Sequence, residues 1–147
     1  MQLESKIRSI IEMECEDYFL GMVDLSHVKN SLIEKYGSLI TEYPRAISVG
    51  ITLPLVILDE LSFSKDTLYN ETYCHLKSIT SHLSNLLEQK GFKTLSMPRT
   101  KNKDQQTISF HEVVANLADM GKIEKNILIT PEVGSRVNWG TILTDAP

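Results

Sequence analysis

The chain has 147 residues, 41% hydrophobic and 23% charged, with a formal net charge of −4. This length and composition are typical of one globular domain with a hydrophobic core, so we expect a single domain over residues 1–147. No apolar run approaches the roughly 20 residues that cross a bilayer, and no secretory signal opens the chain. We therefore expect a cytoplasmic protein without a membrane partner, and the charge argues against a dedicated nucleic-acid binder.

Apolar residues at helical spacing from Leu3 onward predict an amphipathic first helix. The segment Tyr18–Leu25 then has the composition of a strand. Ser26 stands where a helix N-cap is expected, before a short helix that Gly37 would end. This part of the chain is thus predicted to run helix, strand, helix.

A buried strand is predicted over Ala46–Leu53, and Pro54 is placed to begin a short helix that runs to Leu61. The longest predicted element is a helix over Asp66–Lys90, because its large aliphatic residues recur on one face. Gly91 is expected to end that helix as a C-cap residue.

The last third of the chain continues this alternation. "FKTLSMP" predicts a strand, "RTKNKDQQT" a polar loop with a basic patch, and "ISFHEVVANLADMG" a helix that reaches Gly121. "KNILIT" and "RVNWGTILT" predict two strands, which the turn-forming "PEVGS" would join as a hairpin. The element order predicts an α/β (α+β) layered sandwich with a mixed central sheet flanked by helices.

The isolated cysteines and histidines suggest no metal site. Cys15 and Cys74 form no CxxC pair, and we expect buried, free thiols rather than a disulfide. His75 and His82 lie seven residues apart, about 10 Å along a helix, whereas helical metal pairs use a spacing of four. We expect both to be half-buried or at the surface, and His27 to be exposed.

Two further features near the C-terminus carry possible chemistry. His111, beside Glu112 in the first turns of a predicted helix, is a candidate for proton handling, but a helix-start histidine without a catalytic role is the simpler explanation. The turn "PEVGSR" offers free amides, a hydroxyl and a guanidinium that could hold an anion. Alternatively, Gly134 is there because a tight turn needs a positive φ. The chain has no GxSxG elbow and no dinucleotide-binding fingerprint.

The densest motifs follow residue 108. They comprise a degenerate glycine-containing run, then "LITPEVGSR", then a strand ending in "LTDAP". This pattern resembles the epoxyqueuosine reductase family and its iron–sulfur relatives, whose runs read Gly-Leu-Gly-Trp-Ile-Gly-Lys-Asn, Leu-Ile-Thr-Pro-Glu-Tyr-Gly-Ser-Arg and Leu-Thr-Asp-Ala-Pro. Fainter likeness extends upstream through "YPRAISVGITLP" and "HLSNLLEQKGFKTLSMP". The matching positions are Gly121, Ile123, Lys125, Asn126, Ile129, Thr130, Pro131, Glu132, Gly134, Ser135, Arg136, Leu143, Thr144, Asp145, Ala146 and Pro147.

The resemblance implies a nitroreductase-like domain that binds cobalamin and is followed, in the family, by a ferredoxin-like module with iron–sulfur clusters. With two cysteines, this chain is expected to lack that module and to hold no four-cysteine cluster, so a ferredoxin-like electron donor is an expected partner. A tRNA partner is implied only for a true epoxyqueuosine reductase. The implied site residues are Lys125, Asn126, Ser135 and Arg136 for cofactor contacts, and Asp104 or His111 for proton handling.

The chain also departs from the family pattern. Asp119, Lys122 and Glu124 stand where the family has glycine, tryptophan and glycine, and Gln105 falls where the reductases carry an acidic proton donor. These departures favour one alternative, a non-catalytic interaction or scaffold domain that kept the fold. A second alternative is a flavin-dependent, nitroreductase-like homodimer with FMN between its subunits. The basic N-terminal residues that typically hold the FMN phosphate in such enzymes are not found here.

Overall fold

The helices and strands are taken from a computed structural model, which describes residues 2–28, 31–52, 65–97, 109–124, 127–134 and 136–146. The helices are α1 (Gln2–Glu12), α2 (Ser31–Glu34), α3 (Gly37–Glu42), α4 (Lys65–Gln89) and α5 (Phe110–Leu117). The strands are β1 (Tyr18–Asp24), β2 (Arg45–Thr52), β3 (Thr94–Ser96), β4 (Lys122–Glu124), β5 (Ile127–Ile129) and β6 (Val137–Thr144).

The main sheet has four strands in the order β1-β2-β6-β3, and every neighbouring pair is antiparallel. The prediction of a mixed sheet is therefore wrong. The predicted hairpin of the last two strands is also wrong, because β5 pairs with β4 in a separate two-stranded sheet. β6 lies inside the main sheet, between β2 and β3. All eight of its residues are buried, as expected of a strand that does not lie at an edge.

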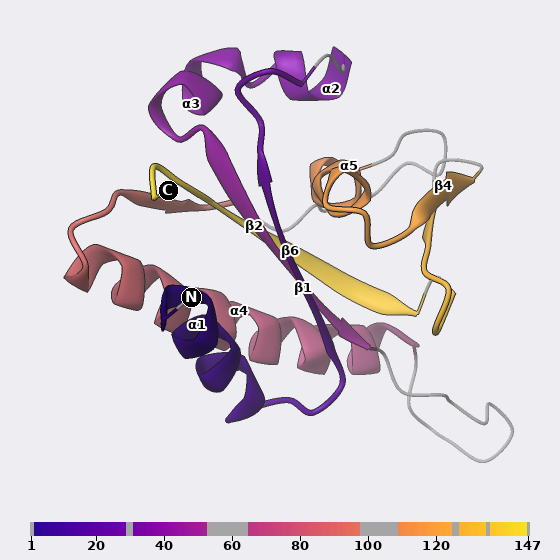
Figure 1. Ribbon diagram of the computed structural model, residues 1–147. Helices are drawn as coiled ribbons and strands as arrows, with labels where there is room; N and C mark the ends of the chain where they lie inside the picture. The colour runs from indigo at the N-terminus through magenta and orange to yellow at the C-terminus, as the bar shows by residue number, and fades with distance from the viewer. Residues whose placement is uncertain are drawn as a thin grey trace, which may run out of the picture.

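Helices cover both faces of the main sheet, which confirms a layered α+β architecture (Figure 1). The helices α1 and α4 pack on one face around a core that includes Ile7, Ile47 and Leu83. On the other face, α5 packs against the sheet through Val113 and Val114. Among the described helices, none combines the length and the apolar composition that crossing a membrane requires.

Several predicted boundaries differ in the structure. Ser26 caps no helix, because the next helix begins only at Ser31. Its N–H and hydroxyl donate instead to the Asp24 carboxylate, at 2.9 and 2.6 Å. Gly37 begins α3 instead of ending a helix, and α5 ends at Leu117, short of Gly121. The helix predicted from Pro54 and the polar loop "RTKNKDQQT" lie outside the described residues.

The cysteine and histidine predictions hold in part. His27, His75 and His82 are exposed, as expected. Both cysteines are free thiols, but Cys74 is exposed and Cys15 is half-buried, so the expectation of two buried thiols is wrong. Cys74 lies on an outward face of α4, which its place in the helical period determines.

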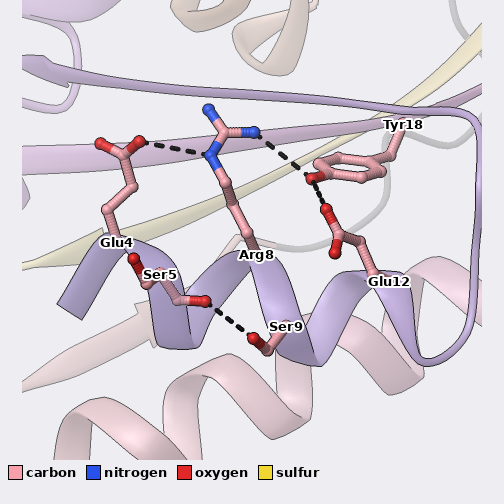
Figure 2. A network of polar contacts seen from close by, with 6 residues as sticks. All are labelled: Glu4, Ser5, Arg8, Ser9, Glu12 and Tyr18. Atoms are coloured by element: carbon pink, nitrogen blue, oxygen red, sulfur yellow. Dashed lines mark hydrogen bonds and ion pairs between the residues drawn. The ribbon is translucent and has the colours of Figure 1, made fainter. Parts of the chain in front are cut away.

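A network of polar side chains fixes α1 to the start of β1 (Figure 2). The Tyr18 hydroxyl donates to the Glu12 carboxylate at 2.6 Å and accepts from Arg8 at 3.3 Å. Arg8 also pairs with Glu4, one turn earlier on the same helix, at 3.2 Å. The two bonds to Tyr18 connect α1 to the first residue of β1.

Candidate functional site

The C-terminal third is organised by α5, whose start is fixed by a reciprocal pair of hydrogen bonds. The Ser109 hydroxyl accepts from the Glu112 N–H at 3.2 Å, and the Glu112 carboxylate accepts from the Ser109 N–H at 3.4 Å. This arrangement is a capping box, which satisfies amides that a helix start leaves unpaired. It orients the following residues of α5 toward the sheet.

Glu112 also joins α5 to the second sheet. Its other carboxylate oxygen accepts from the Leu128 N–H at 3.0 Å, and the residue is only 8% exposed. A buried carboxylate with these donors supports the structure, because it satisfies backbone amides of two elements. The spacing of Ser109 and Glu112 is the S-x-x-E signature of a capping box, so the sequence contained the signal for this role.

His111 is buried between α5 and the main sheet. It is 6% exposed, and its Nδ1 lies 2.8 Å from the Thr141 hydroxyl on β6. Thr141 pairs across the sheet with Ser48, which is fully buried and whose hydroxyl has no hydrogen-bond partner in the described part of the chain. His111, Thr141 and Ser48 are thus neighbouring polar side chains in the otherwise apolar interface between α5 and the main sheet. Because they are buried, they can meet a substrate only if the packing opens.

The end of α5 adopts a conformation that favours glycine. Asp119 has a φ of 65°, in the left-handed region. Its N–H donates to the Asn116 carbonyl at 2.9 Å, and the Met120 N–H donates to the Ala115 carbonyl at 3.1 Å, which together make a Schellman motif. Asp119 is one of the positions at which the family resemblance placed a glycine.

In the turn after β5, backbone amides form hydrogen bonds within the turn itself. The Gly134 N–H donates to the Thr130 carbonyl at 3.0 Å, and the Val133 N–H donates to the Thr130 hydroxyl at 3.1 Å. Gly134 has a φ of 64°, which confirms the expected positive φ. The Arg136 N–H also donates within the turn, to the Val133 carbonyl at 3.3 Å. The expectation of free amides is therefore wrong for Val133, Gly134 and Arg136, since all three N–H groups are hydrogen-bonded.

The predicted site residues are only partly described. His111 lies in the core of the α5 face, and Arg136 is half-buried directly after the turn. Within the described ranges, no group of three or more histidine, cysteine, aspartate or glutamate residues could hold a metal ion. The other candidates lie outside the described residues: Asp104, Lys125, Asn126 and Ser135.

The fold is similar to that of solved epoxyqueuosine reductases. A crystal structure of that enzyme with a tRNA stem loop has a TM-score of 0.69 at 17% identity. The Bacillus subtilis enzyme, with its catalytic loop swung out of the active site, has a TM-score of 0.68 at 16% identity, and the Streptococcus thermophilus enzyme 0.62 at 17%. Each match covers 99% of this chain and 46% of the other, so this chain spans about half the length of those enzymes.

No protein-family model matches the chain, and no curated protein sequence matches it. At these identities, the structural similarity establishes a common fold.

Proposed function

We propose that this chain is a cofactor-binding domain of an oxidoreductase related to epoxyqueuosine reductase, with a nitroreductase-like fold and cobalamin as its ligand. The fold similarity over 99% of the chain is the observation that supports the proposal. The motif matches after residue 108 point to the same family. A ferredoxin-like module or protein would supply electrons, since this chain has only two cysteines.

The described residues fit cobalamin in one respect and fail to fit it in another. Arg136 follows the turn and would pair with an anionic group of the ligand, as guanidinium groups do with phosphates. Two glycines do not form a ligand cradle, however. A Cβ added at Gly121 would lie 2.7 Å from the Ile129 carbonyl oxygen, and one at Gly50 would lie 2.6 Å from the Trp139 ring. Protein atoms already occupy both spaces.

The proposed division of roles follows from this fit. The corrinoid would supply the redox chemistry when bound, and the protein would bind and orient it. We assign ligand contacts to Lys125, Asn126, Ser135 and Arg136, and proton handling to Asp104. We assign His111 a positioning role, because its ring is buried against Thr141.

Ligand retention tests the proposal. The chain is incubated with hydroxocobalamin and, separately, with FMN, then passed through gel filtration while visible spectra are recorded. We expect cobalamin to be retained at close to one equivalent, and Arg136→Gln to weaken retention about tenfold or more through loss of a charge-assisted bond. Arg8→Gln is the matched control, because Arg8 pairs on α1 with Glu4.

The outcomes separate the alternatives. Retention of FMN alone would favour the flavin-dependent reductase. Loss of both chromophores on the column would overturn the ligand-binding proposal.

A non-catalytic scaffold is the second candidate. The left-handed conformation of Asp119, at a position where the resemblance places glycine, supports it. In this case the wild-type chain binds no cobalamin, and the triple variant Asp119→Gly, Lys122→Trp, Glu124→Gly gains retention. If the triple variant folds but gains none, these three substitutions are not the cause of the lost site.

A further inference from the structure

A cavity of about 230 Å³ lies on the sheet face covered by α1 and α4, opposite the face that holds His111. Its walls are mostly apolar and come from three elements: Ile7 on α1, Ile47 on β2 and Leu87 on α4. Its polar lining residues are Asp24, Arg45 and Thr144. The last residues of β1 and β6 and the first of β2 close its end. The cavity therefore lies at one end of three neighbouring strands, and neither His111 nor Arg136, the assigned site residues that the structure describes, lines it.

The rim of the cavity carries a guanidinium with remaining hydrogen-bonding capacity. The Arg45 side chain is 41% exposed, and its contacts are long: 3.8 Å to the Asp24 carboxylate and 3.5 Å to the Ala146 carbonyl oxygen. The Asp24 carboxylate makes shorter bonds to Ser26, at 2.6 and 2.9 Å. A guanidinium has five N–H donors, so Arg45 can still bind a carboxylate through two parallel hydrogen bonds.

Two exposed lysines lie next to wall residues along the chain. Lys6 directly precedes the wall residue Ile7, and Lys90 lies one helical turn after the wall residue Leu87. Lys6 lowers the pKa of Lys90 through direct side-chain interaction and charge repulsion. Neither lysine lines the cavity, so the positive charge at its wall comes from Arg45.

We propose that this cavity binds a small amphipathic carboxylate, with its apolar body between α1 and α4 and its carboxylate on Arg45. The volume limits the size of the ligand. At roughly 30 Å³ per water-sized group, it holds about eight such groups, fewer than a drug-sized ligand contains. A medium-chain fatty acid or a small aromatic acid has this size and this distribution of charge.

Titration of the full chain with octanoate, followed by amide chemical shifts, tests the proposal. We expect saturable shifts at the ends of β1 and β6, and octan-1-ol, which lacks the carboxylate, should bind at least tenfold more weakly. Arg45→Gln should weaken octanoate binding about tenfold, since it removes the charge-assisted pair. Lys77→Gln, on an exposed position of α4 outside the cavity, should leave it unchanged.

A second pair of variants tests the location. Met22 lines the cavity and is 45% exposed, so Met22→Trp should block the mouth without disturbing the core. Met13→Trp, at a residue 84% exposed and outside the cavity lining, is its control. No octanoate binding at millimolar concentration would overturn the proposal. Equal binding of octanoate and octan-1-ol, or octanoate binding that Met22→Trp leaves intact, would also overturn it.

Discussion

At the scale of single residues, Tyr18 shows how two neighbours act on one hydroxyl in opposite directions. The hydroxyl donates to the Glu12 carboxylate at 2.6 Å, and this bond raises the pKa of Tyr18 because the carboxylate stabilises the protonated phenol. Burial raises it further. Arg8 lowers it, because its N–H donates to the phenol oxygen and its charge favours the phenolate. The net shift is upward.

We predict that Glu12→Gln lowers the pKa of Tyr18 and that Arg8→Gln raises it, measured as the pH dependence of the tyrosine ring-carbon NMR signal. A raised folded pKa gives a stabilising contribution that is complete below the unfolded pKa of about 10 and is lost as the pH rises through the folded value. The wild-type chain should therefore lose this contribution in alkaline solution. Shifts of the same sign in both variants would contradict the network in Figure 2.

At the scale of secondary-structure elements, α4 and α5 end in the same way with different residues. Both ends are Schellman motifs: the Phe92 N–H donates to the Leu87 carbonyl at 3.0 Å after α4, as Met120 does to Ala115 after α5. The residue in the left-handed conformation is Gly91 after α4, with a φ of 90°, but Asp119 after α5. An aspartate there strains the backbone and places a negative charge at a helix C-terminus.

We predict that Asp119→Gly raises the free energy of unfolding by up to about 1 kcal/mol, since the relief of strain exceeds the entropy that glycine adds to the unfolded chain. Gly91→Ala should lower it by about 1 kcal/mol for the opposite reason. Urea unfolding followed by circular dichroism measures both.

Gly37→Ala is the matched control for these helix-end variants. Gly37 begins α3, has no positive φ, and a Cβ there would meet no atom within 4 Å. This change should be neutral or stabilising. A destabilised Asp119→Gly variant would show that the aspartate side chain contributes a contact that outweighs the strain.

The elements that the sequence predicted correctly are those whose signal is local. The long helix α4 repeats its apolar stripe over many turns, and Gly91 ends it at the expected place. β2 and β6 are rich in apolar and β-branched residues, and nearly every residue in them is buried, as in strands covered on both faces. These features depend only on residues close together in the sequence.

Strand pairing was not predictable in the same way. The turn "PEVGS" is real, since Thr130 and Gly134 form an isolated bridge, but it redirects the chain instead of pairing β5 with β6. β4 has three exposed residues and no apolar period, so its pattern gave no signal. The burial of His111 depends on Thr141, thirty residues later on β6, and no local pattern encodes that contact.

At the scale of the whole molecule, the main sheet separates apolar packing on its two faces. One core lies between the sheet and the helices α1 and α4, and includes the fully buried Leu83. The α5 face holds two separate clusters, one with Val114 and one with the single tryptophan, Trp139. Because β2 and β6 contribute residues to both faces, loss of the packing on either face exposes strands on which the other face depends.

We therefore predict that the two faces unfold together. Leu83→Ala should lower the free energy of unfolding by about 2–5 kcal/mol, and Val114→Ala by roughly 2 kcal/mol, because each leaves a cavity in a core. In both variants, Trp139 fluorescence and far-UV circular dichroism should report the same urea midpoint, as expected of a two-state transition. The Leu83→Ala variant is the stricter test, since the substituted side chain and the fluorescent ring lie on opposite faces. If that variant shows a circular-dichroism transition at lower urea than its fluorescence transition, the α1–α4 layer unfolds independently of the α5 layer.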